Sequence, residues 1–230
     1  RGLGDVYKRQ DLKDAISYNE IFEQLTKLNL DIYRPSHYIL PSRMEKYAAL
    51  YGDKQGKIGF NQVGREMGIR RLMAINLMKR MESSVYSFNL TLCRIKELID
   101  TTIDSIDDFE ASAGAKINLT DITDADEYDL DDQNNDDFAA FGKKVQIDLA
   151  DMDRISWRAE LVKDQEILEL LTLMVADITP AHDSKLQELL TVLREKVTHP
   201  INPGNRKVII FTAFADTAMY LYEHVSSVMQ

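Results

Sequence analysis

The sequence has a single cysteine, Cys93, among its 230 residues. One cysteine can form neither an internal disulfide nor a thiolate zinc site, and this usage is typical of a reducing compartment, so we expect a cytoplasmic protein. The four histidines (His37, His182, His199 and His224) are scattered and form no H-x3-H pair. A disulfide framework is therefore excluded and a zinc centre is disfavoured. Because Cys93 lies within a helical pattern, we expect it to be a buried packing residue.

Long apolar runs and the usual nucleotide-binding motifs are also missing. No apolar stretch approaches the roughly 18 residues that a membrane span requires, so no membrane partner is expected. The sequence contains no G-x-x-x-x-G-K-[ST] phosphate loop, no G-x-G-x-x-G fingerprint after a strand and no G-x-S-x-G elbow. We therefore assign no catalytic residue and no metal ligand, and we expect this chain alone to bind no cofactor and to be inactive as an enzyme.

The net charge of −10 belongs to one segment rather than to the whole chain. Asp121–Asp137 carries nine of the 38 acidic residues and no basic residue, which leaves 29 acidic against 28 basic residues elsewhere. The acidity therefore does not exclude a nucleic-acid partner for the rest of the protein. The same segment has too few apolar residues to offset its ordering entropy, so we interpret 114–148 as a disordered acidic insertion.

The first ten residues, RGLGDVYKRQ, differ in kind from the rest of the chain. One DNA sequence that can encode all ten residues resembles the end of a transposase-based sequencing adapter. We therefore expect residues 1–10 to be adapter-derived and exclude them from the fold prediction. The protein itself is then expected to begin at Asp11, as a fragment of a longer gene product.

Apolar residues at steps of three and four predict a mainly α-helical protein. Residues 11–28 and 42–51 are expected to be helical, with Pro35 and Pro41 in an extended, packed connection between them. The strongest pattern predicts one unbroken helix from about Gly68 to Phe109. Its predicted apolar seam consists of Ala74, Met78, Met81, Val85, Phe88, Leu92, Ile95, Ile99, Ile103 and Ile106.

A second long helix is predicted from about Leu149 to Ile178, because it ends before Pro180. Two long helices joined by an insertion predict an antiparallel hairpin with the insertion at its tip. Trp157 is expected to anchor helix packing rather than to stack on a base. A further helix comes next, for which Asp183 or Ser184 is the expected N-cap.

The pattern changes at KVIIF, residues 207–211, a continuous β-branched and apolar run that is typical of a buried parallel strand. The TAFAD segment after it is predicted to be a loop, and a helix is expected from about Thr217. The last residues thus predict a truncated α/β unit that needs neighbouring strands to complete a sheet.

Several segments, taken in order along the chain, resemble a known family. LMKRMESSVYSFNLTLCRI, DSKLQELLTVLREK and RKVIIFTAFADTAMYLYEHV look like superfamily-two helicases of the Snf type, in particular the RapA-like bacterial translocases. LNLDIYRPSHYILPSRMEKY resembles the connector that leaves the first RecA-like lobe of that family. The resemblance covers Asp11–Gln230 and implies a fragment of an ATP-dependent nucleic-acid helicase or translocase that itself lacks the ATPase motifs.

The same resemblance implies cofactors, a partner and an order of segments. The parent protein would bind ATP and magnesium through motifs outside this chain, and its partner would be nucleic acid, expected to be DNA. The implied segments are 11–60, the connector leaving the first RecA-like lobe; 61–113, a long helix; 114–148, the acidic insertion; 149–204, helices leading to the second lobe; and 205–230, the truncated start of the second RecA-like lobe.

Four residues are candidates for contacting nucleic acid. In the resembling helicases the loop after the KVIIF strand touches the nucleic-acid backbone, which implies this role for Thr212 and Phe214. The alternative is that Thr212 caps the next helix and Phe214 packs beneath it. Lys79 and Arg80 could steer a phosphate, or they could belong to a solvated helix face.

A second class of function remains open beside the translocase fragment. In that alternative the protein is a helical scaffold or adaptor, whose hairpin docks protein partners and whose strand belongs to an unrelated fold. A GKT-type loop upstream and a Q-x-x-G-R-x-x-R-type motif downstream in the flanking gene would favour the translocase.

Overall fold

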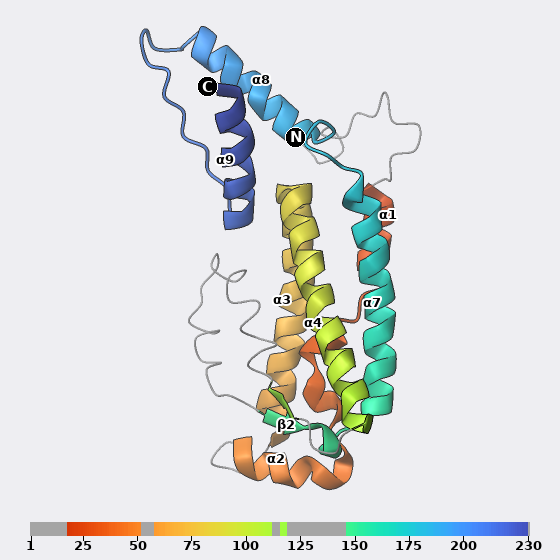
Figure 1. Ribbon diagram of the computed structural model, residues 1–230. Coiled ribbons are helices and arrows are strands. Elements are labelled where there is room, and N and C mark those ends of the chain that lie inside the picture. Colours follow the sequence, from red (N-terminus) through yellow and green to blue (C-terminus); the bar gives the residue numbers. More distant parts are fainter. Residues whose placement is uncertain (1–17, 52–57, 112–115, 119–145, 230) are drawn as a thin grey trace.

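The computed structural model describes residues 18–51, 58–111, 116–118 and 146–229, and in this part the protein is mainly helical, as predicted. The predicted adapter segment, residues 1–10, lies outside the described residues. The α-helices are α1 (Tyr18–Leu25), α2 (Met44–Tyr51), α3 (Ile58–Ser83), α4 (Val85–Ala111), α7 (Arg154–Ala176), α8 (Ser184–Thr198) and α9 (Ala215–Met229) (Figure 1). None of them has the length and apolarity that crossing a lipid bilayer demands.

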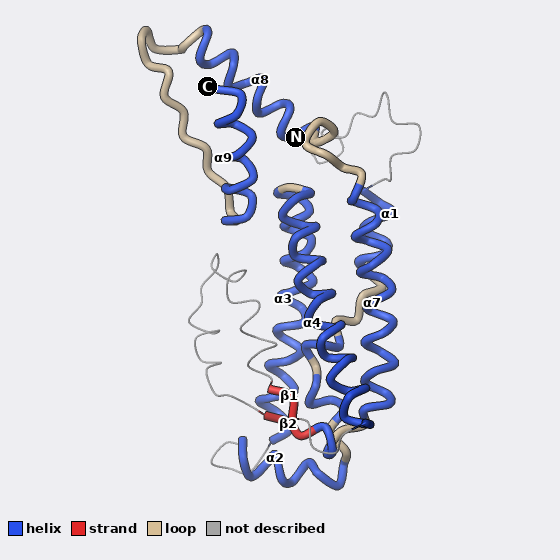
Figure 2. The backbone as a smooth tube through the Cα atoms, in the orientation of Figure 1, coloured by secondary structure: helices blue, strands red, loops and turns tan. Residues whose placement is uncertain are grey.

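Helices α3, α4 and α7 lie side by side and enclose the main core (Figures 1 and 2). Helix α4 runs antiparallel to α7, since Asp107 near its end pairs with Arg158 near the start of α7. Burial of one apolar face per helix supplies most of the stability of such an arrangement. The core side chains that these three helices bury most completely are Met73, Leu77, Phe88, Leu92, Ile95, Ile99, Ile106, Trp157, Leu161, Leu168 and Leu171.

The prediction of one unbroken helix from Gly68 to Phe109 is wrong, because the chain reverses direction at Ser84 (Figure 2). The Ser84 N–H donates to the Arg80 carbonyl of α3, and the Ser84 carbonyl accepts from the Phe88 N–H of α4. The Ser84 hydroxyl accepts from the Ser87 N–H at 3.0 Å. One serine therefore ends one helix and caps the next.

The apolar spacing misled the sequence prediction because both helices face the same core. The part of the predicted apolar seam that lies in α4 is buried from Phe88 to Ile106. In α3 the buried apolar side chains are Met73, Leu77 and Met81, so of the predicted seam Met81 is buried, Met78 is half-buried and Ala74 is exposed. When the chain folds back into a second helix, a different set of positions faces the core, but the apolar residues still recur every three or four positions.

The predicted hairpin between α4 and a helix beginning near residue 149 is confirmed, although the connecting segment is not wholly as expected. Strand β1 (Lys116–Asn118) pairs antiparallel with β2 (Gln146–Asp148), so both ends of the predicted disordered range 114–148 form a small sheet. Residues 119–145, which contain the acidic run, lie outside the described residues. A short 3-10 helix, η5 (Leu149–Asp151), then leads into α7.

The proline-containing connection is packed, as predicted, but the prediction that it is extended is wrong. It forms the 3-10 helices η2 (Asp31–Tyr33), η3 (Pro35–Tyr38) and η4 (Pro41–Arg43). Leu30, before η2, adopts a left-handed backbone with φ 55° and is buried. The Asp164 carboxylate of α7 holds this turn by accepting the N–H groups of Asn29 and Asp31 at 2.7 and 2.9 Å. Trp157 is fully buried and donates its indole N–H to the Asp31 carbonyl, which confirms its role as a packing anchor.

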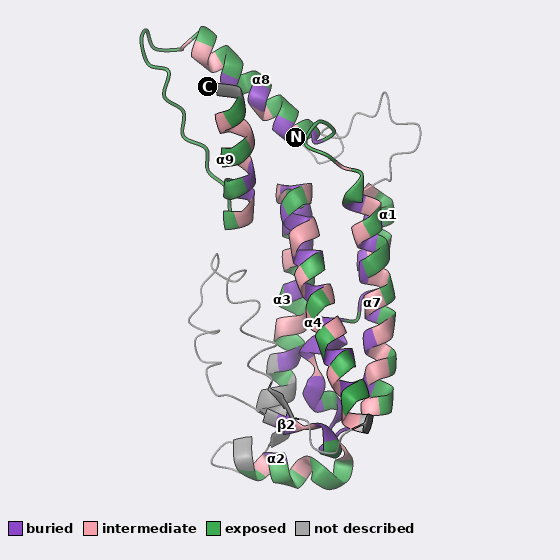
Figure 3. Ribbon diagram, viewed as in Figure 1, coloured by how far each residue is buried: buried purple, intermediate pink, exposed green. Residues whose placement is uncertain are grey.

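The C-terminal residues depart from the sequence prediction. Asp183 caps α8 by accepting the Leu186 N–H, as expected, and α9 begins at Ala215. Residues 207–211, however, form no strand, and residues 201–213 of the connection between α8 and α9 are exposed (Figure 3). The described residues therefore show no α/β unit at 205–230, and no strand among them pairs with the KVIIF run.

Two smaller expectations are also corrected. Cys93 is exposed on α4 rather than buried, because it lies opposite the Leu92 and Ile95 face. Helix α3 begins at Ile58, well before the start predicted near Gly68.

Candidate functional site

The structure brings two of the four candidate residues together at the point where α9 meets the α3–α4 turn (Figure 1). Phe214 is buried just before α9, and the Arg80 guanidinium lies 4.5 Å from the centre of its ring. Thr212 is exposed, and its hydroxyl oxygen accepts the Phe214 N–H at 3.4 Å. Lys79 is exposed, and in the described structure no hydrogen bond or ion pair joins it to these residues.

Asp216, in the first turn of α9, is the centre of the contact. Its carboxylate accepts from Arg80 at 2.9 Å and from Arg94 at 3.0 Å. The Arg80 side chain is 3 % exposed and also donates to the Ser87 hydroxyl at 2.8 Å. Two guanidinium groups from different helices thus share one carboxylate, and this cross-link holds the start of α9 against α3 and α4.

A group of hydroxyls completes the junction. Thr217, buried in α9, lies within hydrogen-bonding distance of Ser83 at 3.0 Å and of Ser84 at 3.2 Å. Lys185 at the start of α8 donates to the Glu82 carbonyl near the end of α3. The end of α3 therefore receives partners from both α8 and α9, and Lys185 satisfies one of the carbonyls that a helix C-terminus leaves free.

An aromatic pair extends the same junction along α9. Tyr86 of α4 stacks on Tyr220 of α9 with their ring centres 5.0 Å apart. The Tyr220 hydroxyl donates to the Asp183 carboxylate at 3.0 Å, so the N-cap of α8 is also tied to α9. Burial, followed by the nearby Asp183 charge, raises the pKa of Tyr220 well above its usual range. Tyr220 therefore stays a neutral donor in this contact.

We call this set the apex junction: Arg80, Ser83, Ser84, Ser87, Arg94, Phe214, Asp216 and Thr217. It unites candidates that the sequence places 134 positions apart, namely Arg80 and Phe214. Sequence reasoning missed Arg94 and Asp216, because a lone aspartate at a helix start is typical of capping and gives no sign of its partners. The serine pair in an otherwise apolar heptad pattern was the one local signal of the turn.

In this arrangement the two basic candidates have different surroundings. The Arg80 guanidinium contacts a ring, a hydroxyl and a carboxylate inside the junction, so it positions α9. Lys79 and Thr212 are exposed. Of the four candidates, these two have side chains that are open to solvent.

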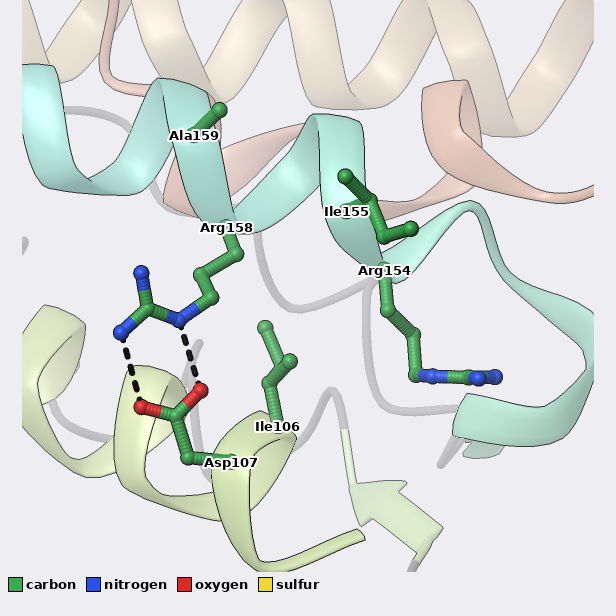
Figure 4. A pocket seen from close by; sticks show the side chains of 6 residues that line it. All are labelled: Ile106, Asp107, Arg154, Ile155, Arg158 and Ala159. Carbon is green, nitrogen blue, oxygen red and sulfur yellow. Dashed lines mark hydrogen bonds and ion pairs between the residues drawn. The ribbon is translucent and has the colours of Figure 1, made fainter. Parts of the chain in front are cut away.

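A second polar location lies at the opposite end of the bundle, in a pocket of about 420 Å³ between α4 and α7 (Figure 4). Arg158 forms a two-pronged pair with Asp107 at 2.6 and 2.8 Å, and this pair lowers the pKa of Asp107. Arg154 donates to the Leu149 carbonyl at 2.8 Å and lies over the Phe109 ring. Because both arginines already hold the helices together, the pocket has a structural role in this state.

No group of three His, Cys, Asp or Glu side chains in the described residues is placed to hold a metal ion. No protein-family model, no curated protein and no solved structure matches this chain.

Proposed function

We propose that this chain is the helical region between two RecA-like lobes, together with the first strand and helix of the second lobe, of an ATP-dependent nucleic-acid translocase. The proposal begins from the resemblance carried by the quoted segments. It also rests on one structural observation, the state of residues 208–211. These four consecutive apolar residues are exposed by 44, 78, 40 and 89 % of their surface, directly before a well-formed helix.

Such a run costs free energy in water and is seldom left open in a complete domain. A strand followed by a loop and a helix is the repeating unit of parallel α/β sheets, which bury each strand on both faces. Exposure of this run is therefore the state expected of the unit when the rest of its sheet is missing.

The apex junction has a defined task in this proposal. Asp216, Arg80 and Arg94 join the first turn of α9 to the helical region, so movement of the second lobe would be transmitted to α3 and α4. Thr212 directly follows the residues that would form the strand in the complete lobe, where its hydroxyl and the free N–H groups of the α9 start would meet a nucleic-acid phosphate. ATP and magnesium would be bound by the lobes flanking this chain.

The coding sequence on both sides of this chain tests the proposal directly. We expect a GKT-type loop upstream and a Q-x-x-G-R-x-x-R-type motif downstream, and ATP hydrolysis by the longer protein that nucleic acid stimulates. Flanking sequence without either motif would overturn the proposal.

A substitution in the longer protein tests the assigned contact. Thr212→Val should weaken nucleic-acid binding equally for all sequences and leave ATP affinity unchanged, because a phosphate contact carries no sequence information. Thr191→Val is the matched control, since Thr191 is an exposed threonine on α8 that donates only to the Gln187 carbonyl. Unchanged binding with lowered thermal stability would show that Thr212 is only a helix cap.

One observation favours the alternative of a helical scaffold that docks a protein partner. Leu170 and Leu173 lie on the outer face of α7, exposed by 44 and 66 %. Adjacent exposed leucines at this spacing are typical of a helix that packs against another protein. The flanking sequence separates the two functions, because a scaffold needs neither ATPase motif.

A further inference from the structure

The segment from Val208 to Ala213 has a backbone with open hydrogen-bonding groups. Within the described residues, no N–H or C=O of this segment takes part in a hydrogen bond. An unpaired strand-like segment of this kind is a template for pairing with another chain. Figure 3 shows it running along the outside of the protein between α8 and α9.

The side chains alternate in exposure along the segment. Val208 and Ile210 are 44 and 40 % exposed, whereas Ile209 and Phe211 are 78 and 89 % exposed. A period of two is that of a β-strand with one face towards the molecule and one towards solvent. The exposure pattern is thus the one expected of a strand that lacks a neighbour.

We propose that the neighbour is the same segment of a second copy of this chain, paired antiparallel around Ile210. Charge selects the direction. Arg206 and Lys207 precede the apolar run and no acidic residue lies between 201 and 213, so parallel pairing would place like charges side by side. Antiparallel pairing puts these basic residues at opposite ends of the ribbon.

Side-chain matching selects the register. With Ile210 opposite Ile210, Phe211 lies opposite Ile209 twice, and aromatic side chains paired with β-branched ones stabilise antiparallel strands. A register centred on Ile209 would instead place Phe211 opposite Lys207. Helix α9 begins at Ala215, so the pairing from Lys207 to Ala213 ends before the helix. The two identical strands form a two-fold, self-complementary contact.

This interface requires the exposed segment of the 230-residue chain; in the longer protein of the proposed function the same segment would instead pair with strands of its own sheet. The mass of the full 230-residue chain, measured by light scattering after size exclusion at increasing concentrations, should rise from one chain to two. Ile209→Lys should keep the protein monomeric without unfolding it, since this side chain is 78 % exposed. Met219→Lys on α9, at a position 62 % exposed, is the control and should dimerise normally.

Cysteine cross-linking tests the register in a Cys93→Ser background, which removes the exposed native thiol. Residues directly opposite in an antiparallel pair lie within disulfide range, and diagonal ones do not. Ile210→Cys should therefore form an intermolecular disulfide under mild oxidation, and Ile209→Cys should form much less. Three outcomes would each overturn the proposal. They are a chain that stays monomeric at all concentrations, equal cross-linking at both positions, and polydisperse aggregation that Ile209→Lys does not abolish.

Discussion

Removing the charge of Asp216 should loosen α9 from the rest of the protein. Asp216→Asn keeps the size of the side chain and one acceptor oxygen, but it leaves Arg80 and Arg94 without the carboxylate that they share. Because the Arg80 side chain is only 3 % exposed, water cannot replace the lost anion there. The variant therefore tests whether the apex junction holds α9.

The magnitude depends on burial. Breaking a fully buried ion pair costs about 3–5 kcal/mol, but Asp216 is 20 % and Arg94 34 % exposed, so water offsets part of the loss. We expect Asp216→Asn to weaken the attachment of α9 by about 2–3 kcal/mol. Asp107→Asn is the matched control, because the Asp107–Arg158 pair is 48 and 43 % exposed. Its loss should cost under about 1 kcal/mol.

Amide hydrogen exchange measures the attachment of α9 separately from global unfolding. A loss of about 2 kcal/mol corresponds to exchange about thirtyfold faster in α9, with α7 little changed. Urea unfolding followed by circular dichroism gives the global free energy for both variants. If Asp216→Asn leaves α9 exchange as slow as Asp107→Asn does, the junction does not hold the helix and our reasoning from burial is wrong.

Three further outcomes are expected. Hydrogen bonding from Lys46, and next from Tyr47, lowers the pKa of Asp151. The ionised Asp151 carboxylate therefore stabilises the fold above its unfolded-state pKa, and this stabilisation is lost as pH falls through the lowered pKa. Asp151→Asn should flatten the decline of the unfolding free energy below about pH 4. Ser84→Ala should cost about 1 kcal/mol in thermal unfolding, because Ser84 caps α4, while Ser226→Ala near the end of α9 should cost less, because the Ser226 hydroxyl donates only within its own helix. The purified chain should not hydrolyse ATP with or without nucleic acid, and measurable turnover would contradict the placement of the ATPase motifs outside it.

Local patterns in the sequence were enough to predict most helices and the residues that they bury. The three- and four-residue rhythm identified the α4 face from Phe88 to Ile106, because side chains on one face of a helix recur at that spacing in any fold. Asp183 was a correct N-cap for the same reason, since capping involves only the next three residues.

The candidate site could be predicted only in part. Arg80 and Phe214 were chosen for separate reasons, and nothing in the sequence places them 4.5 Å apart. Their partners Arg94 and Asp216 were missed, because an ion pair between distant segments has no local signature. Their meeting depends on the position of α9 against α3 and α4.

What tertiary structure alone decided is the direction of the chain and the fate of its last strand. The rhythm of apolar residues is the same whether a helix continues through Ser84 or folds back there, and the packing of α3 and α4 into one core decides between the two. Residues 207–211 have the composition of a buried strand, yet they lie exposed. A helix satisfies its backbone hydrogen bonds within its own segment, whereas a strand needs a neighbour that the segment itself cannot provide.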